Sequence, residues 1–182
     1  MAALSWMLCE HVFDGRATPV GWAVGAVAGL VAITPACGFI MTWAAWLLGV
    51  TVSPVCFFSA KFFKKLGVDD SLDSFAIHAI GGAWGAFWTG LFATSVGNGI
   101  NSGAFYGVPV QLGWQFAAIS LSFSYTFAIT TAIILLLKYT IGIRVSEEDE
   151  LAGLDVSEHG MKPTFAVQVG SEDPSATVPS KV

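Results

Sequence analysis

The sequence predicts an all-α membrane protein, folded as a polytopic helical bundle, on two observations. Charged residues make up only 12% of the 182 residues and the mean hydropathy is +0.69, whereas ordinary soluble domains carry about 25% charged residues. Residues 17–60 and 74–137 contain no Asp, Glu, Lys or Arg at all. A helix needs roughly 20 mostly apolar residues to cross the hydrocarbon core. The first stretch therefore accommodates two crossings, and the second accommodates two crossings with a loop between them.

The N-terminal segment, residues 1–9, is apolar but too short to span a bilayer. Its charged neighbours come after it, whereas a signal peptide has basic residues before its apolar stretch. We therefore expect residues 1–9 to be the end of a helix that begins upstream of Met1.

The first two complete spans are predicted at residues 18–36 and 40–60. In the first, Gly21, Gly25 and Gly29 are four residues apart and share one helical face. A stripe of small residues allows a neighbouring helix to approach closely. We therefore expect this face to pack against another helix.

The third complete span is predicted at residues 71–94. Asp70 and Asp73 precede it with the three-residue spacing of a helix-capping motif. Pro54, inside the second span, is expected to kink that helix. The remaining segments are a loop rich in Gly and Asn, 95–111, and a last span, about 112–140.

The basic residues indicate the topology. There are eight of them: Arg16, Lys61, Lys64, Lys65, Lys138, Arg144, Lys162 and Lys181. With one partial and four complete transmembrane helices, all eight fall on the same side of the membrane. Because Lys and Arg accumulate in cytoplasmic segments, we expect a multi-pass protein of the cell membrane with a cytoplasmic C-terminus.

Composition also argues against other classes of function. The chain has no basic patch with interleaved aromatic residues, so a nucleic-acid partner is not expected. The three cysteines, Cys9, Cys37 and Cys56, lack metal-ligand spacing, so we expect neither a metal nor a cofactor. We find no nucleophile–base pair or phosphate-binding loop and expect no enzyme activity.

His78 is the most informative single residue. It lies inside a predicted span with no charged residue until Lys138. An ionisable side chain within a transmembrane helix is costly and usually faces a cavity or a transport pathway. The alternative is a neutral histidine that is hydrogen-bonded to a neighbouring helix.

Three ordered segments carry a family resemblance. They are GAVAGLVAITPACGFI at 25–40, GVDDSLDSFAIHAIGGAWGAFWTGLFA at 67–93, and GIRVSEEDELAGLDVSEHG at 142–160. Together they resemble the ammonium transporter family (Amt/Mep/Rh), and the chain is similar to the C-terminal part of its subunit. The resemblance implies a homotrimer of eleven-helix subunits, with one pore for ammonium or ammonia through each.

The resemblance also assigns site residues. His78 matches the second of two histidines that line a narrow apolar pore, and Thr34 and Ser74 match positions in the substrate pathway. A neutral imidazole can accept a hydrogen bond from the passing nitrogen or relay its proton. Asp70 and Asp73 match an acidic cap, for which we expect a structural role at the start of the helix.

The resemblance divides the chain into three parts. Residues 1–141 correspond to the C-terminal half of the membrane domain, 142–165 to a cytoplasmic regulatory region, and 166–182 to a tail of disordered composition. In the regulatory region the matching residues are Asp155, Ser157 and His159, and some relatives have a phosphorylatable Thr at the position of Ser157. A cytoplasmic regulator of this region is a possible partner.

The first pore histidine and the inverted partner repeat are expected upstream of Met1. A pore at the interface of two repeats cannot be built from one repeat, so we expect the chain alone not to conduct. Two alternatives remain: an ammonium sensor or receptor on the same fold, and a structural membrane protein in which His78 is buried.

Overall fold

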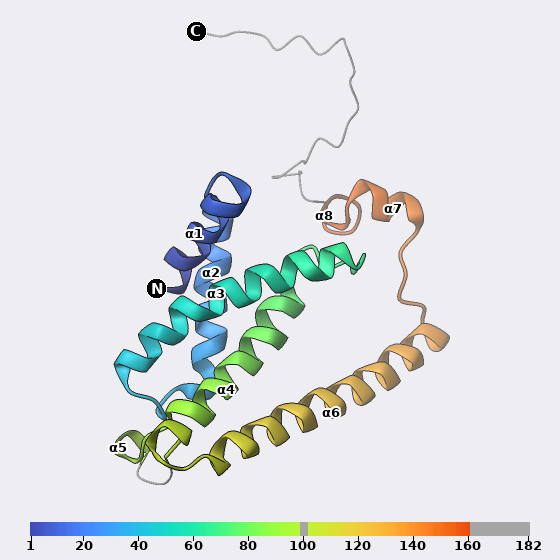
Figure 1. Ribbon diagram of the computed structural model, residues 1–182. Helices are drawn as coiled ribbons and strands as arrows, with labels where there is room; N and C mark the ends of the chain where they lie inside the picture. The colour runs from blue at the N-terminus through green and yellow to red at the C-terminus, as the bar shows by residue number, and fades with distance from the viewer. Residues whose placement is uncertain (99–101, 161–182) are drawn as a thin grey trace, which may run out of the picture. The chain divides into compact units, whose positions relative to one another are not determined.

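The computed structural model describes residues 1–98 and 102–160 (Figure 1). Regular structure in these ranges is helical, apart from one isolated bridge between Ile40 and Ala93. The chain divides into two compact units, Met1–Ala128 and Ile129–Val182, and each is described by itself. The predicted tail at 166–182 lies outside the described residues.

The helices follow one another along the chain with short connections. They are α1 (Ala2–Asp14), α2 (Pro19–Ile33), the 3-10 turn η1 (Thr34–Ala36), α3 (Thr42–Lys65), the π-helical η2 (Phe75–Ile80), α4 (Gly81–Phe92), α5 (Ser95–Asn98), the 3-10 turn η3 (Ala104–Tyr106), α6 (Val110–Thr140), α7 (Glu147–Ala152) and α8 (Leu154–Ser157).

Among the residues that the structure describes, three helical stretches are long and apolar enough to cross a membrane: Pro19–Ala36, Thr42–Lys65 and Val110–Thr140. The helix expected at 71–94 is present as η2 followed directly by α4. It starts at Phe75, four residues later than predicted, because Asp73 adopts a left-handed backbone conformation with φ of 54°. A non-glycine residue in that region interrupts a right-handed helix.

The glycine stripe of α2 packs against α1, as its spacing predicted. A Cβ atom on Gly25 would overlap the Trp6 side chain, and one on Gly29 would lie 2.7 Å from the Cβ of Ala2. Helix α1 runs to Asp14, beyond the apolar residues 1–9. The lack of side chains on the stripe lets the two helix backbones approach closely.

Two serine hydroxyls join α1 to α3. Ser53 Oγ, which is fully buried, donates to the carbonyl oxygen of Ala2 at 2.7 Å. Ser5 Oγ donates to the carbonyl oxygen of Val50 at 2.8 Å. Pro54 has no N–H to donate to Val50, four residues before it, so Ser5 supplies the donor that the proline removes.

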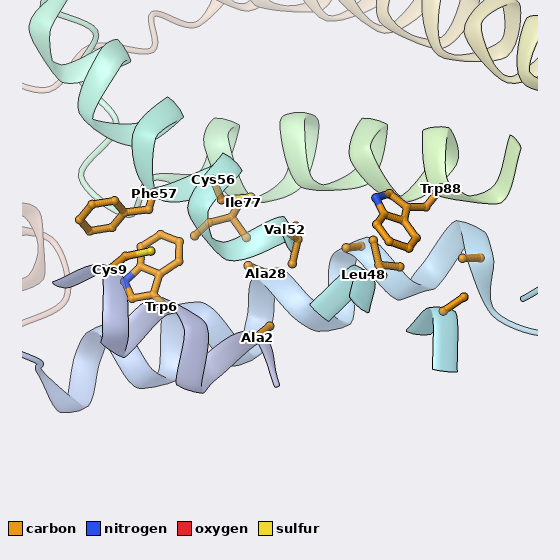
Figure 2. Packing of buried hydrophobic residues seen from close by; sticks show 13 residues of the cluster. Ala2, Trp6, Cys9, Ala28, Leu48, Val52, Cys56, Phe57, Ile77 and Trp88 are labelled. Atoms are coloured by element: carbon orange, nitrogen blue, oxygen red, sulfur yellow. The ribbon is translucent and has the colours of Figure 1, made fainter. Parts of the chain in front are cut away.

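The buried core lies where α1, α2, α3, η2 and α4 meet (Figure 2). Trp6 of α1 packs edge-on against Phe57 of α3, with ring centroids 5.6 Å apart. Ile77 of η2 belongs to the same buried cluster as Cys56 and Val52 of α3 (Figure 2). This packing fixes η2 on the bundle through its buried face.

The second unit contains the end of α6 and the two short helices α7 and α8. Gly142 ends α6 with a φ of 80°. Ser146 caps α7: its Oγ accepts from the Asp149 N–H at 3.1 Å and donates to Asp149 Oδ2 at 2.6 Å. Arg144 and Glu150 form an exposed ion pair at 2.9 Å.

Candidate functional site

The candidate site is centred on η2, the π-helical turn that carries His78. Asp70 organises the start of this turn, because its carboxylate accepts the backbone N–H of Ser74 at 2.9 Å and of Phe75 at 2.8 Å. These are donors that a helix start leaves unpaired. Single π-turns within helices are rare and often occur at functional sites.

Asp73 makes a different contact from Asp70. Its carboxylate, which is partly buried, pairs with Lys64 at the end of α3 at 2.9 Å. The ion pair ties the left-handed residue before η2 to the preceding helix. Asp70 thus bonds to the backbone at the start of η2, whereas Asp73 forms an ion pair with Lys64 of α3.

His78 is exposed in the described part of the chain. Its neighbours Ala76 and Ile77 are buried against the bundle, so the anchored face of η2 is a different one from the face of His78. Within the first unit, the described helices therefore leave the imidazole accessible from outside the bundle.

Thr34 lies at the end of α2, where that helix tightens into η1, and its side chain is also exposed. The hydroxyl donates to the carbonyl oxygen of Leu30 at 2.7 Å. A hydroxyl has one proton and two lone pairs. With its proton engaged, the Thr34 oxygen is available as an acceptor. Ser74, the third predicted pathway residue, is exposed at the N-terminal end of η2.

The predicted regulatory residues lie in and after α8. Ser157 Oγ is 3.3 Å from both the Asp149 and the Gly153 carbonyl oxygens, to which it donates. The His159 N–H donates to the carbonyl oxygen of Leu154 at 3.3 Å. Asp155 lies within α8. In residues 1–98 and 102–160 no group of His, Cys, Asp and Glu has a metal-binding arrangement.

One buried polar residue of this region was not predicted from the sequence. Thr89 in α4 is 5% exposed and its Oγ1 is 3.1 Å from the carbonyl oxygen of Pro35, in η1. The sequence pattern that could have indicated Thr89 is the four-residue spacing of Gly81, Gly85 and Thr89. This spacing places three small residues on one face of α4.

The fold and site define a polytopic helical membrane protein with an exposed histidine in an apolar helix. Comparison with known proteins agrees. The model of the Ammonium Transporter Family matches residues 1–164. The chain is 43% identical over 161 residues to the ammonium transporter of Bacillus subtilis, covering 86% of this chain and 39% of that protein.

Solved structures give the same result. The crystal structure of Saccharomyces cerevisiae Mep2 matches 81% of this chain and 35% of its own, with 32% identity and a TM-score of 0.76. A structure described as a sensor Amt protein matches 86% of this chain and 38% of its own, with 27% identity and a TM-score of 0.72. This chain belongs to the ammonium transporter family, and it spans about two-fifths of the length of the relatives it matches.

Proposed function

We propose that this chain forms one wall of a pathway for ammonium or ammonia in a full-length transporter subunit, with His78, Thr34 and Ser74 on that wall. The observation that carries the proposal is the exposed His78 on a π-turn in a span that has no charged residue. The rest of the pathway would come from the portion of the relatives that this chain does not cover.

The chemistry of the wall suits ammonium. An apolar constriction raises the free energy of any bare cation by several kcal/mol. An alkali ion has no way to avoid this cost, whereas ammonium can give up a proton. His78 provides an imidazole nitrogen that can accept a hydrogen bond or a proton, and Thr34 provides an oxygen acceptor.

We also propose the topology of one partial and four complete transmembrane helices, with η2 and α4 together as the third complete crossing. The basic residues support it: Arg16 follows α1, and Lys61, Lys64 and Lys65 end α3. In this proposed topology the start of η2 lies at the cytoplasmic side, the turn after α2 lies outside, and the C-terminus lies in the cytoplasm. Asp70 and Asp73 then have a structural role at the cytoplasmic start of the pore helix.

For the assembly we propose a homotrimer in the cell membrane, with the regulatory region at 142–165 as the contact for a neighbouring subunit or a cytoplasmic regulator. Asp155, Ser157 and His159 lie in this region. Phosphorylation of Ser157 would remove its hydroxyl donor from Asp149 and Gly153 and place negative charge near Glu158. Equal transport by Ser157→Asp and by the wild type would contradict this regulation.

The transport proposal is tested by replacing His78 in a full-length subunit that carries this sequence as its C-terminal part. We expect His78→Ala to change the rate of methylammonium uptake, or the selectivity for methylammonium over potassium, by at least about tenfold. Loss of a positioned proton acceptor can change a rate by more than this. His11→Ala, a matched change outside the predicted spans, should leave both unchanged. Unchanged uptake and selectivity in His78→Ala would contradict the pathway assignment.

A sensor is the second candidate, because a protein described as a sensor Amt protein shares this fold. In a sensor the full-length protein would bind ammonium without sustained uptake of methylammonium. Concentrative or steady uptake into vesicles would exclude the sensor as the sole function.

A further inference from the structure

We propose that Thr89 is a positioning residue for the ammonium pathway: its hydroxyl fixes the turn that carries Thr34 and so determines where the Thr34 oxygen lies relative to His78. The inference rests on the proposed function of Thr34 and His78.

The first step is the hydrogen bond itself. Thr89 Oγ1 lies 3.1 Å from the carbonyl oxygen of Pro35 and 3.0 Å from that of Gly85, one turn before it in α4. The backbone N–H groups that follow Pro35 bond elsewhere, with Cys37 donating to Thr34 and Phe39 to Ala36. The single Thr89 hydroxyl proton is shared between the Pro35 and Gly85 carbonyls, and it gives Pro35 a donor where an unpaired carbonyl away from water is costly.

The second step is the close approach that makes this bond possible. A Cβ atom on Gly85 would overlap the carbonyl oxygen of Ala32 and lie 2.8 Å from Pro35 Cγ. The α4 backbone is thus in contact with the end of α2. Thr89 is four residues after Gly85, on the same face of α4, and its short side chain reaches the carbonyl of Pro35, three residues after Ala32.

The third step is what else holds the turn. The Thr94 N–H donates to the carbonyl oxygen of Phe39 at 2.8 Å, and Ile40 bridges to Ala93. The far end of the turn is therefore attached to the chain after α4, and Thr89 makes the hydrogen bond nearer to Thr34. Without the Thr89 hydroxyl, the part of the turn next to Thr34 loses its hydrogen bond to α4.

The connection to His78 runs through one continuous helix. Helix η2 carries His78 and passes directly into α4, which carries Thr89. A helix is a stiff spacer, so the attachment of η1 to α4 sets the offset between Thr34 and His78. Hydrogen bonds weaken steeply when their geometry departs from the favoured range, so a shifted Thr34 oxygen would accept more weakly from ammonium.

The test uses three variants of the full-length subunit and measures methylammonium uptake. Thr89→Val keeps the shape but removes the donor, and we expect KM to rise about fivefold, the equivalent of one net hydrogen bond, with kcat changed far less. Thr89→Ser retains the hydroxyl and should restore the wild-type KM. The matched control is Thr51→Val, which removes the acceptor of the Trp84 Nε1 hydrogen bond at 3.1 Å in the same bundle; its KM should stay that of the wild type.

Several outcomes would overturn the inference. These are an unchanged KM in Thr89→Val, an equal loss in Thr89→Val and Thr89→Ser, or a Thr89→Val protein that fails to reach the membrane when Thr51→Val reaches it normally. The last outcome would show that the hydroxyl holds the fold as a whole rather than one turn.

A fourth variant, Thr34→Val, separates this inference from the proposed function. If Thr34→Val raises KM and Thr89→Val does not, the positioning role is wrong and the pathway assignment stands. If Thr34→Val leaves KM unchanged, the assignment of Thr34 to the pathway is itself wrong, and the role of Thr89 fails with it.

Discussion

Single hydroxyl groups in this chain bond to carbonyls that helix breaks leave without a backbone donor. Ser5 donates to Val50, whose carbonyl is freed by Pro54, and Thr89 donates to Pro35. In a membrane environment, water does not replace a missing backbone partner. Each hydroxyl therefore pairs with one carbonyl that lacks a backbone donor. Its contribution to stability should be smaller where a backbone N–H can pair with that carbonyl instead.

This dependence can be measured for Ser5 in a double-mutant cycle. Ser5→Ala should lower the free energy of unfolding by about 1 kcal/mol, the net value of a typical hydrogen bond. In a Pro54→Ala background the same change should have a smaller effect, because residue 54 regains an N–H that can donate to Val50. The readout is thermal unfolding of the purified protein in detergent. Equal effects of Ser5→Ala in both backgrounds would show that the hydroxyl does not compensate for the proline.

At the scale of single residues, the sequence indicates the roles of some side chains but not of others. His78 is conspicuous because it is an ionisable group in a long run without charge, and Asp70 because of its place before an apolar segment. The roles of Ser5 and Thr89 depend on carbonyls 45 and 54 residues away. Such partners are set by how the helices approach one another, which local sequence patterns do not specify.

At the scale of elements, helix packing in the first unit relies on missing side chains. We expect Gly25→Ala to destabilise the protein by about 1–3 kcal/mol, the usual cost of forcing extra atoms into a packed contact, because the new Cβ would overlap Trp6. Gly113→Ala in α6 is the matched control, since a Cβ there meets nothing within 4 Å. Thermal unfolding in detergent compares the two, and equal stability would contradict the close packing of α1 on α2.

The extents of the elements were less predictable than their existence. The apolar runs correctly indicated α2, α3 and α6, but the third span begins at Phe75 and its first turn is π-helical. The later start of this span results from the left-handed backbone of Asp73. The sequence does not predict that conformation, because aspartate also occurs at the start of ordinary helices. The expected loop at 95–111 likewise contains the short elements α5 and η3.

At the scale of the whole molecule, the three cysteines allow the proposed topology to be tested. Cys37 is exposed in the turn after α2, whereas Cys9 and Cys56 are buried. A membrane-impermeant maleimide added to intact cells should label the protein at Cys37, and Cys37→Ser should abolish the labelling. Labelling of Cys37 only after the membrane is permeabilised would place this turn in the cytoplasm and invert the topology.

The bond between Ser5 and the carbonyl of Val50 has an evolutionary consequence. If Ser5 is retained because Pro54 removes a donor, the two positions should covary among homologous proteins. Sequences with another residue at the position of Pro54 would tolerate alanine or glycine in place of Ser5, whereas sequences that keep the proline would keep a hydroxyl there. Two positions on different helices would then behave as one unit of natural selection.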